Sequence, residues 1–142
     1  MALFIGMETA RPLALCVAYP SLGDYLAGKD ITLVFQGRAK EIRSTAGGQV
    51  VTFEVIRVWK GDPHRTQPVY SGLVYENRPF EDSREFVSGE EYFVVTFEPE
   101  GDLADRIQMP TGMKEAASCS SSPFSDPYVQ KLLRGHSGRK PR

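Results

Sequence analysis

The histidines and the paired carboxylates are the residues of this chain whose types could support catalysis or metal binding. There are two histidines: His64 follows Gly-Asp-Pro in a turn, and His136 lies in a polar segment near the C-terminal end. Histidines so placed form neither a paired zinc site nor a relay that activates a nucleophile. Glu90 and Glu91 are adjacent, so in a strand they point to opposite faces and cannot share one substrate. We therefore expect no catalytic residue, no metal ligand and no cofactor, and a protein that is not an enzyme.

Length and composition favour one soluble globular domain. Hydrophobic residues make up 41% of the 142 residues and charged residues 25%, which argues against a disordered or membrane-spanning chain. The 17 basic and 18 acidic residues give a net charge of -1, so no overall charge excess favours nucleic acid or an anionic membrane. Partner choice must then rest on local patches and shape.

Two long strand signals dominate the first half of the chain. They run from Ile31 to Arg43 and from Gln49 to Lys60, and the Gly-rich turn between them predicts an antiparallel hairpin. Gly37 indicates a bulge or a close backbone approach in the first strand. A short helix is predicted before the hairpin, from Ser21 as N-cap to Gly28 as stop signal.

The second of these strands carries apolar residues on both faces. Alternation places Val51, Phe53 and Val55 on one face, and on the other Val50, Thr52, Glu54, Ile56 and Val58. This pattern is typical of a curled strand that lines a small barrel and also packs beneath a helix. Trp59, near the strand end, is expected to cap the core.

The second half of the chain predicts shorter elements. They are a third strand at Pro68–Gly72, a long polar excursion at 73–88, a fourth strand at Glu91–Glu98, a fifth at Met113–Ser118 and a closing helix at Ser125–Arg134. Residues 1–13 are expected to be a leader or a disordered segment, 14–135 the domain, and 136–142 a flexible basic tail. Five strands with flanking short helices predict a mainly β protein, a five-stranded OB-like Greek-key barrel.

The order of local motifs strengthens this prediction. Along the chain follow LVFQGR at Leu33–Arg38, a strand that ends in Trp-Lys-Gly at Gly61, VYSG at Val69–Gly72, SGEEYFVVTF at Ser88–Phe97, and then Cys119. This order resembles the netrin-like module, the inhibitory domain of tissue inhibitors of metalloproteinases, and in particular single-domain bacterial members of that family. The resemblance covers roughly Cys16 to Gly135 and implies the same OB-like barrel.

The resemblance also implies a pairing for the two cysteines. Cys16 matches the second cysteine of the Cys-x-Cys start of the animal inhibitors, and Cys119 matches the partner of that second cysteine. The first cysteine is replaced by Ala14, and its partner is also absent between Leu73 and Phe80. A Cys16–Cys119 disulfide would favour an oxidising compartment, hence a secreted or cell-envelope location. The alternative is two unrelated buried thiols in a cytosolic protein.

The resemblance finally implies a binding role. Animal members block zinc proteases through the amino group and carbonyl of an N-terminal cysteine, whereas a peptide nitrogen within the chain is a poor zinc ligand. We therefore expect a protein-binding module that is a monomer without a membrane span. The resemblance implies a zinc metalloprotease as a candidate partner, but binding to it does not require this chain to coordinate the zinc ion. The contact residues that the resemblance brings to one rim are Cys16, Val17, Ala18, Tyr19, Pro20, Leu73, Val74, Tyr75 and Pro79.

A second hypothesis is binding of single-stranded nucleic acid, a frequent role of OB-like barrels. Its candidate residues are Tyr70, Tyr75, Arg57, Lys60 and Arg78. The acidic residues of the excursion between positions 73 and 88 oppose it, because they would repel phosphate. Protein rather than nucleic acid is therefore the predicted partner.

Overall fold

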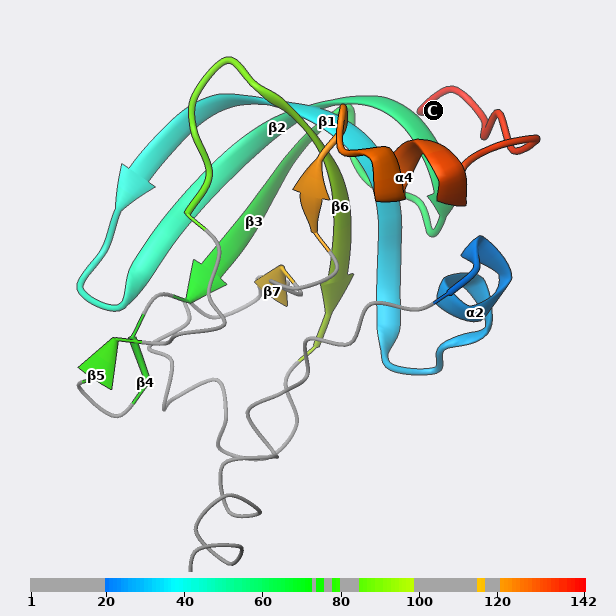
Figure 1. Ribbon diagram of the computed structural model, residues 1–142. Helices are drawn as coiled ribbons and strands as arrows, with labels where there is room; N and C mark the ends of the chain where they lie inside the picture. Colours follow the sequence, from blue (N-terminus) through cyan, green and yellow to red (C-terminus); the bar gives the residue numbers. More distant parts are fainter. Residues whose placement is uncertain (1–19, 73, 76–77, 80–84, 99–114, 117–120) are drawn as a thin grey trace, which may run out of the picture.

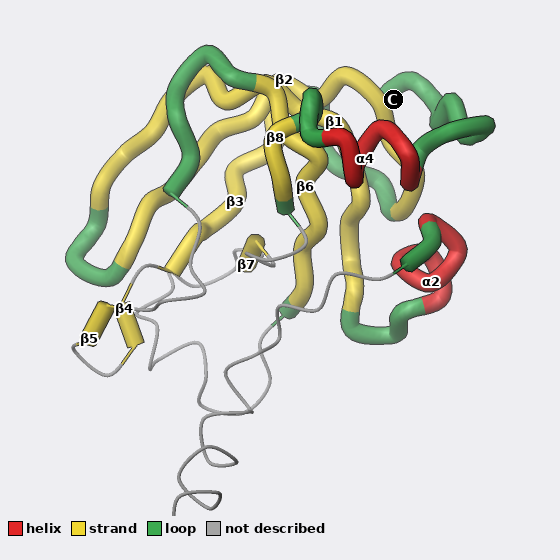
Figure 2. Tube along the Cα trace, in the orientation of Figure 1, coloured by secondary structure: helices red, strands yellow, loops and turns green. Residues whose placement is uncertain are grey.

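A computed structural model describes residues 20–72, 74–75, 78–79, 85–98, 115–116 and 121–142. The described elements are, in chain order, α2 (Leu22–Ala27), β1 (Ile31–Ser44), β2 (Gly48–Lys60), β3 (Thr66–Gly72), β4 (Val74–Tyr75), β5 (Arg78–Pro79), β6 (Glu91–Phe97), β7 (Glu115–Ala116), β8 (Ser122–Pro123) and α4 (Pro127–Leu132). The protein is mainly β, with one strongly curved sheet and two short helices on the same side of it (Figure 1, Figure 2).

Both helices begin at side-chain caps. The Ser21 side chain accepts a hydrogen bond from the backbone N–H of Asp24 at the start of α2, and Gly28 follows its last residue. In α4 the Asp126 side chain accepts from the N–H of Tyr128, and Pro127 occupies the first turn, where its missing N–H leaves no hydrogen bond unmade. The helices predicted from Ser21 and from Ser125 are thus confirmed, with Asp126 as the second N-cap.

The sheet is built around the long strand β1, which has two partners. Its length pairs with β2, from Val34↔Lys60 to Ser44↔Gln49, and its first half also pairs with β6, from Ile31↔Phe97 to Arg38↔Glu91. The strand order is β1-β2-β3-β7-β6-β8 with the additional β1–β6 pairing. In the described residues β3 and β7 meet at one parallel pair, Tyr70↔Glu115, so the sheet is not continuously hydrogen-bonded around the interior.

A bulge in the hairpin changes which side of β2 faces inward. Gly37 pairs with Val55 but Gln36 pairs with Arg57, so Ile56 is an extra residue of β2. The extra residue reverses the alternation, and Val58 packs in the same cluster as Val51 and Phe53. The prediction that Val58 shares a face with Val50, opposite Phe53, is therefore wrong.

Gly37 itself lies close to the aromatic side chains of the interior. A Cβ at this position would come within 2.9 Å of the Phe35 ring and 3.1 Å of the Cβ of Phe53. Backbone and aromatic rings therefore approach each other as closely as a residue without a side chain allows. The predicted close approach at Gly37 is confirmed, and the register shift lies beside it, but the extra residue of the bulge, Ile56, belongs to β2.

Two hydrophobic clusters lie on opposite faces of the sheet. The interior cluster, enclosed by the curved sheet, consists of Leu33, Phe35, Ala39, Val51, Phe53, Val55, Val58, Val69, Phe86, Tyr92 and Val94. The outer cluster lies between the sheet and the two helices, and its buried members are Leu22, Tyr25, Val34, Phe93, Val95, Val129 and Leu132. Alternate residues of β1 and β6 supply both clusters, because successive side chains of a strand point to opposite faces.

The structure tests the sequence predictions to different depths. The mainly β class, the flanking helices and the β1–β2 hairpin are confirmed, as are strands within Pro68–Gly72 and Glu91–Glu98, while β7 lies inside the predicted fifth strand. In the described residues the sheet is not closed. The OB-like Greek-key topology and the domain boundaries stay predictions. So does the flexibility of residues 136–142, which in the structure lie against β2, with Val58 and Arg139 forming an isolated antiparallel bridge.

Candidate functional site

Three strand ends come together at one rim of the sheet. Glu115 of β7 pairs both with Tyr70, near the end of β3, and with Phe97, the last residue of β6. Phe97 in turn pairs with Ile31, the first residue of β1. The ends of β3 and β6 and the start of β1 therefore meet around β7, at the lower edge in Figure 1. We call this region the β7 rim.

The predicted contact segments join the described chain near this rim. Leu73 directly follows the end of β3, and Val74 and Tyr75 form β4, which pairs with β5 through Val74↔Pro79 and Tyr75↔Arg78. Pro20 is exposed and lies just before α2. Cys16 stands four residues before Pro20 in the sequence. Positions 16–19 and 73 lie outside the described residues. So does Cys119, and the predicted Cys16–Cys119 disulfide is thus not among the described features.

At the other end of β6 the outer face of the sheet is polar. The Arg38 guanidinium forms an ion pair with Glu91, and Gln36 donates a hydrogen bond of 2.8 Å to the same carboxylate. Together with Glu90, Phe124 and Gln130 this pair borders an open groove of about 740 Å³. The Glu91 carboxylate thus accepts from two side chains of β1 and links β1 to β6.

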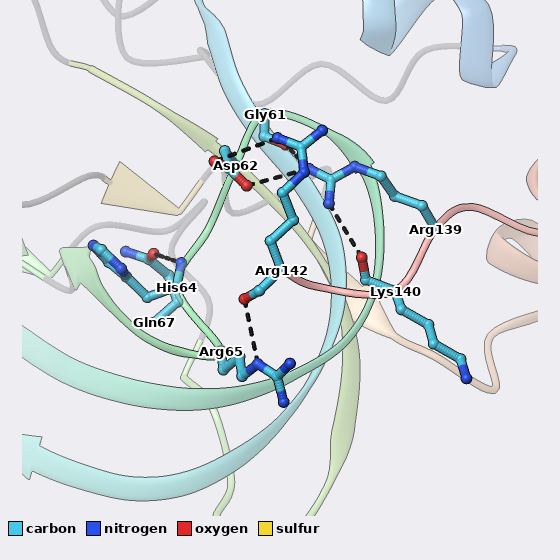
Figure 3. Close-up of polar contacts among 8 residues, drawn as sticks. All are labelled: Gly61, Asp62, His64, Arg65, Gln67, Arg139, Lys140 and Arg142. Atoms are coloured by element: carbon cyan, nitrogen blue, oxygen red, sulfur yellow. Dashed lines mark hydrogen bonds and ion pairs between the residues drawn. The ribbon is translucent and has the colours of Figure 1, made fainter.

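The end of β2 carries a second cluster of polar contacts, with the segment 136–142 (Figure 3). The backbone N–H of Val58 donates to the carbonyl of Arg139 at 2.8 Å, and the Arg139 N–H donates to the Val58 carbonyl at 2.9 Å. The Arg139 side chain donates to the Gly61 carbonyl at 2.6 Å and lies 3.5 Å from the Asp62 carboxylate. Sequence analysis missed this contact; its only local signal is the pair of glycines, Gly135 and Gly138, in a basic segment.

The two histidines are exposed, and each makes a hydrogen bond through its backbone. His64 is exposed, and its backbone N–H donates to the side-chain oxygen of Gln67 at 3.0 Å. His136 is also exposed, and its carbonyl accepts a hydrogen bond from the Trp59 indole at 3.2 Å. Among the residues that the structure describes, no group of three or more histidine, cysteine, aspartate or glutamate side chains could hold a metal ion.

Of the candidate residues for nucleic-acid binding, the side chains that the structure describes are those of Tyr70, Lys60 and Arg57. Tyr70 is fully buried and cannot offer a ring face to a base. The Lys60 ammonium donates a 2.7 Å hydrogen bond to the Gly28 carbonyl, so it connects β2 to the end of α2. Arg57 is half-buried, and the backbone of Tyr75 pairs with that of Arg78 between β4 and β5.

Among the titratable groups of the described residues, Tyr128 has a clear pKa shift. The Tyr128 hydroxyl lies 2.6 Å from the Tyr25 hydroxyl, where α4 meets α2. Burial raises the pKa of Tyr128 well above its usual range, and the hydrogen bond with Tyr25 raises it further. This pair is a contact within the outer cluster and marks the junction of the two helices.

In comparison with known proteins, no family model matches this chain, and no curated protein or solved structure matches it either. Within the described part of the chain, neither helix has the length or the apolar character needed to cross a bilayer. Inference about function therefore rests on the residues and their geometry.

Proposed function

We propose that this chain is a netrin-like, OB-like barrel module without enzymatic activity, which binds another protein through the β7 rim. The observation that carries the proposal is the convergence of three strand ends on Glu115. Glu115 pairs directly with Tyr70 and with Phe97, and Phe97 pairs in turn with Ile31. Loops that a rigid scaffold brings to one edge are the usual location of binding residues.

The strand pairings support an OB-like barrel. From β1 the pairings lead through β2, β3, β7 and β6 and return to β1, because β1 pairs with both β2 and β6. An OB-like barrel brings the first strand into contact with its fourth as well as its second strand in this way. Of these successive strand pairings, the one between β3 and β7 is the shortest, with a single residue pair. The interior cluster is fully packed by aromatic and branched side chains, as in a small barrel.

The same rim supports protein binding. Leu73, the first residue of the excursion, directly follows Gly72 at the end of β3. The residues before α2 are separated from Ile31, the start of β1, by little more than this short helix. One partner could then touch both segments, Cys16–Pro20 and Leu73–Pro79, as the resemblance implies. A secreted or cell-envelope location and the Cys16–Cys119 disulfide belong to the same proposal.

Binding of the full chain to isolated catalytic domains of several zinc metalloproteases tests the proposal. We expect saturable binding to at least one of them, weakened tenfold or more by Tyr75→Ala. The matched control is Val87→Ala, which removes an exposed side chain near the start of β6, away from the β7 rim. Equal weakening by the two substitutions would place the interface elsewhere.

The same measurement separates the partner classes. Single-stranded oligonucleotides are added in place of the protease at two salt concentrations. Strongly salt-dependent binding of the oligonucleotide, with no binding to any protease, would replace the proposal with the nucleic-acid hypothesis. Mass spectrometry of the natively produced protein tests the disulfide. We expect a mass lower than that of the reduced chain by two hydrogen atoms, and free Cys16 and Cys119 thiols would contradict export.

A further inference from the structure

The outer edge of β2 changes its partner near Glu54. Up to this residue β2 pairs with β3, the last pair being Glu54↔Thr66, and the N–H of Val55 still donates to the carbonyl of Arg65. Beyond that point β3 no longer accompanies β2. A strand edge of this kind offers unpaired N–H and C=O groups that another extended chain can use.

The segment 136–142 pairs with this edge through one isolated antiparallel bridge, at Arg139. Val58 and Arg139 exchange both backbone hydrogen bonds, at 2.8 and 2.9 Å, which is a complete antiparallel pair. The chain returns from α4 through Gly135, whose φ of 83° is in the left-handed region, and His136 N–H donates to the Leu133 carbonyl. The segment thus binds its own sheet in the manner of a peptide ligand.

Specific side-chain contacts flank the backbone pair. Gly138 lies against the Trp59 indole, and a Cβ there would come within 3.0 Å of the indole ring and of the Val58 carbonyl. The next residue, Arg139, reaches the Gly61 carbonyl and the Asp62 carboxylate. The edge therefore selects a glycine over the tryptophan, followed by an arginine at the turn after β2.

Further contacts extend this recognition along the segment. The indole N–H of Trp59 donates to the His136 carbonyl at 3.2 Å, two residues before the glycine. On the other side, the Arg65 side chain donates to the Arg142 carbonyl at 3.3 Å, and the Arg142 guanidinium lies 3.6 Å from Asp62 (Figure 3). Most of these contacts are exposed hydrogen bonds or ion pairs, each contributing little by itself. Such a segment can be displaced.

We propose that the β2 edge from Val58 to Asp62 is a strand-addition site for an extended Gly-Arg segment of a partner protein, and that residues 136–142 occupy it as an intramolecular competitor. The competitor has an effective concentration in the millimolar range, because its linker to α4 is short. Free peptides therefore bind only when the tail is displaced. The proposal is independent of the β7 rim. The rim includes Tyr70, near one end of β3, whereas this edge of β2 begins beyond the other end of β3 at Thr66.

A single glycine substitution in the full chain opens the site. Gly138→Ala places a methyl group against Trp59 at a residue with a φ of 71°, and is expected to displace the tail. Gly135→Ala is the matched control: it carries the same left-handed strain, with a φ of 83°, but its methyl group meets no atom within 4 Å. Trp59 is the only tryptophan of the chain, so its fluorescence reports on the site directly.

The probe is a synthetic peptide with the sequence of residues 136–142, titrated while Trp59 fluorescence is recorded. We expect saturable binding to the Gly138→Ala chain. The peptide concentration at half-saturation should be at least tenfold lower than for the unsubstituted chain and for Gly135→Ala. A peptide in which the glycine is replaced by valine should bind at least tenfold more weakly. Binding that is insensitive to this replacement, or absent from Gly138→Ala, would overturn the proposal.

Two further measurements complete the test. If Gly138→Ala does not fold, Arg139→Glu opens the site differently, because it removes the hydrogen bond to Gly61 and places like charge beside Asp62; the same peptide result is expected. Sedimentation of the opened chain distinguishes the occupant. A monomer at all concentrations agrees with a partner protein, whereas a dimer that the peptide dissociates would contradict it and assign the site to a second copy.

Discussion

The two hydrophobic clusters of this protein use the same strands but different chemistry. In the interior cluster Phe53 contacts Phe35, Phe86 and Tyr92 edge to face, at ring-centroid distances of 5.7, 5.3 and 6.3 Å. The outer cluster adds polar groups to apolar packing, namely the hydroxyl pair of Tyr25 and Tyr128 and the half-buried Trp59. The interior is thus assembled mostly from paired strands, with Phe86 added from the segment before β6, whereas the outer cluster requires two helices, far apart in sequence, to be in place.

The outer face also shows where helix cover ends. Val34 of β1, its partner Val95 and the neighbouring Phe93 of β6 lie beneath the helices and are fully buried. Two and four residues further along the same face of β1, Gln36 and Arg38 are half-buried and bind Glu91. Side-chain polarity along a single strand face therefore follows the cover above it, and the comparison predicts a graded response to substitution.

The largest effect is expected from Phe53→Ala in the interior cluster. The substitution should lower the free energy of unfolding by about 3–5 kcal/mol, because it removes a fully buried ring whose neighbours cannot close the cavity. Equilibrium unfolding in urea measures the change, and Phe53→Leu, which retains most of the volume, should cost clearly less. A smaller loss for Phe53→Ala than for the outer substitution described next would reverse the order of the two clusters.

A smaller effect is expected from Leu132→Ala in α4. Its side chain is 7% exposed at the margin of the outer cluster, so the space it leaves is open to water and to helix adjustment. We expect a loss of about 2 kcal/mol, the lower end of the range for leucine truncation. Amide hydrogen exchange sharpens the test: protection should fall in α4 and α2 before it falls in β2. Uniform loss of protection would mean that the two clusters unfold as one unit.

The tyrosine pair should contribute less, and in a pH-dependent manner. Tyr128→Phe removes the hydroxyl that contacts Tyr25 and should cost about 1 kcal/mol at neutral pH. Because burial and this hydrogen bond raise the pKa of Tyr128 in the folded state, the folded chain keeps the proton that the unfolded chain releases above pH of about 10.

The stability from this group is therefore fully present below pH of about 10 and is lost as pH rises toward the folded-state pKa. Chemical unfolding at pH 8, 10 and 11 measures the difference between the unsubstituted chain and Tyr128→Phe. The difference should shrink at the highest pH. A difference that grows as pH rises would contradict the raised pKa.

The smallest effect is expected from Arg38→Ala. The ion pair with Glu91 is exposed on both sides, at 41% and 30% of the side-chain surface, so we expect a loss of at most about 1 kcal/mol. Most of the loss should disappear in 1 M salt, where exposed charges are screened. Thermal unfolding at low and high salt checks this. A loss as large as that of Leu132→Ala would show that the uncovered outer face stabilises the sheet as strongly as the covered one.

The sequence predicted elements whose signals are local. The helix at Leu22–Ala27 follows a serine cap and stops at a glycine, and the hairpin of β1 and β2 follows two long apolar runs around a Gly-rich turn. The inward position of Val58 could not be predicted, because the bulge at Ile56 depends on how β1 pairs with β2. The contact between the 136–142 segment and Val58 was missed for the same reason, since its composition is that of an exposed tail.

Composition, apolar spacing and caps by themselves determined a mainly β chain with two flanking helices, because these depend on neighbours within a few residues. Only the tertiary structure decided which ends meet. Glu115 joins the ends of β3 and β6, and Arg139 takes the edge that β3 leaves open. The physical reason is that backbone hydrogen-bonding groups are the same in every residue, so the sequence does not encode a distant partner in any local pattern.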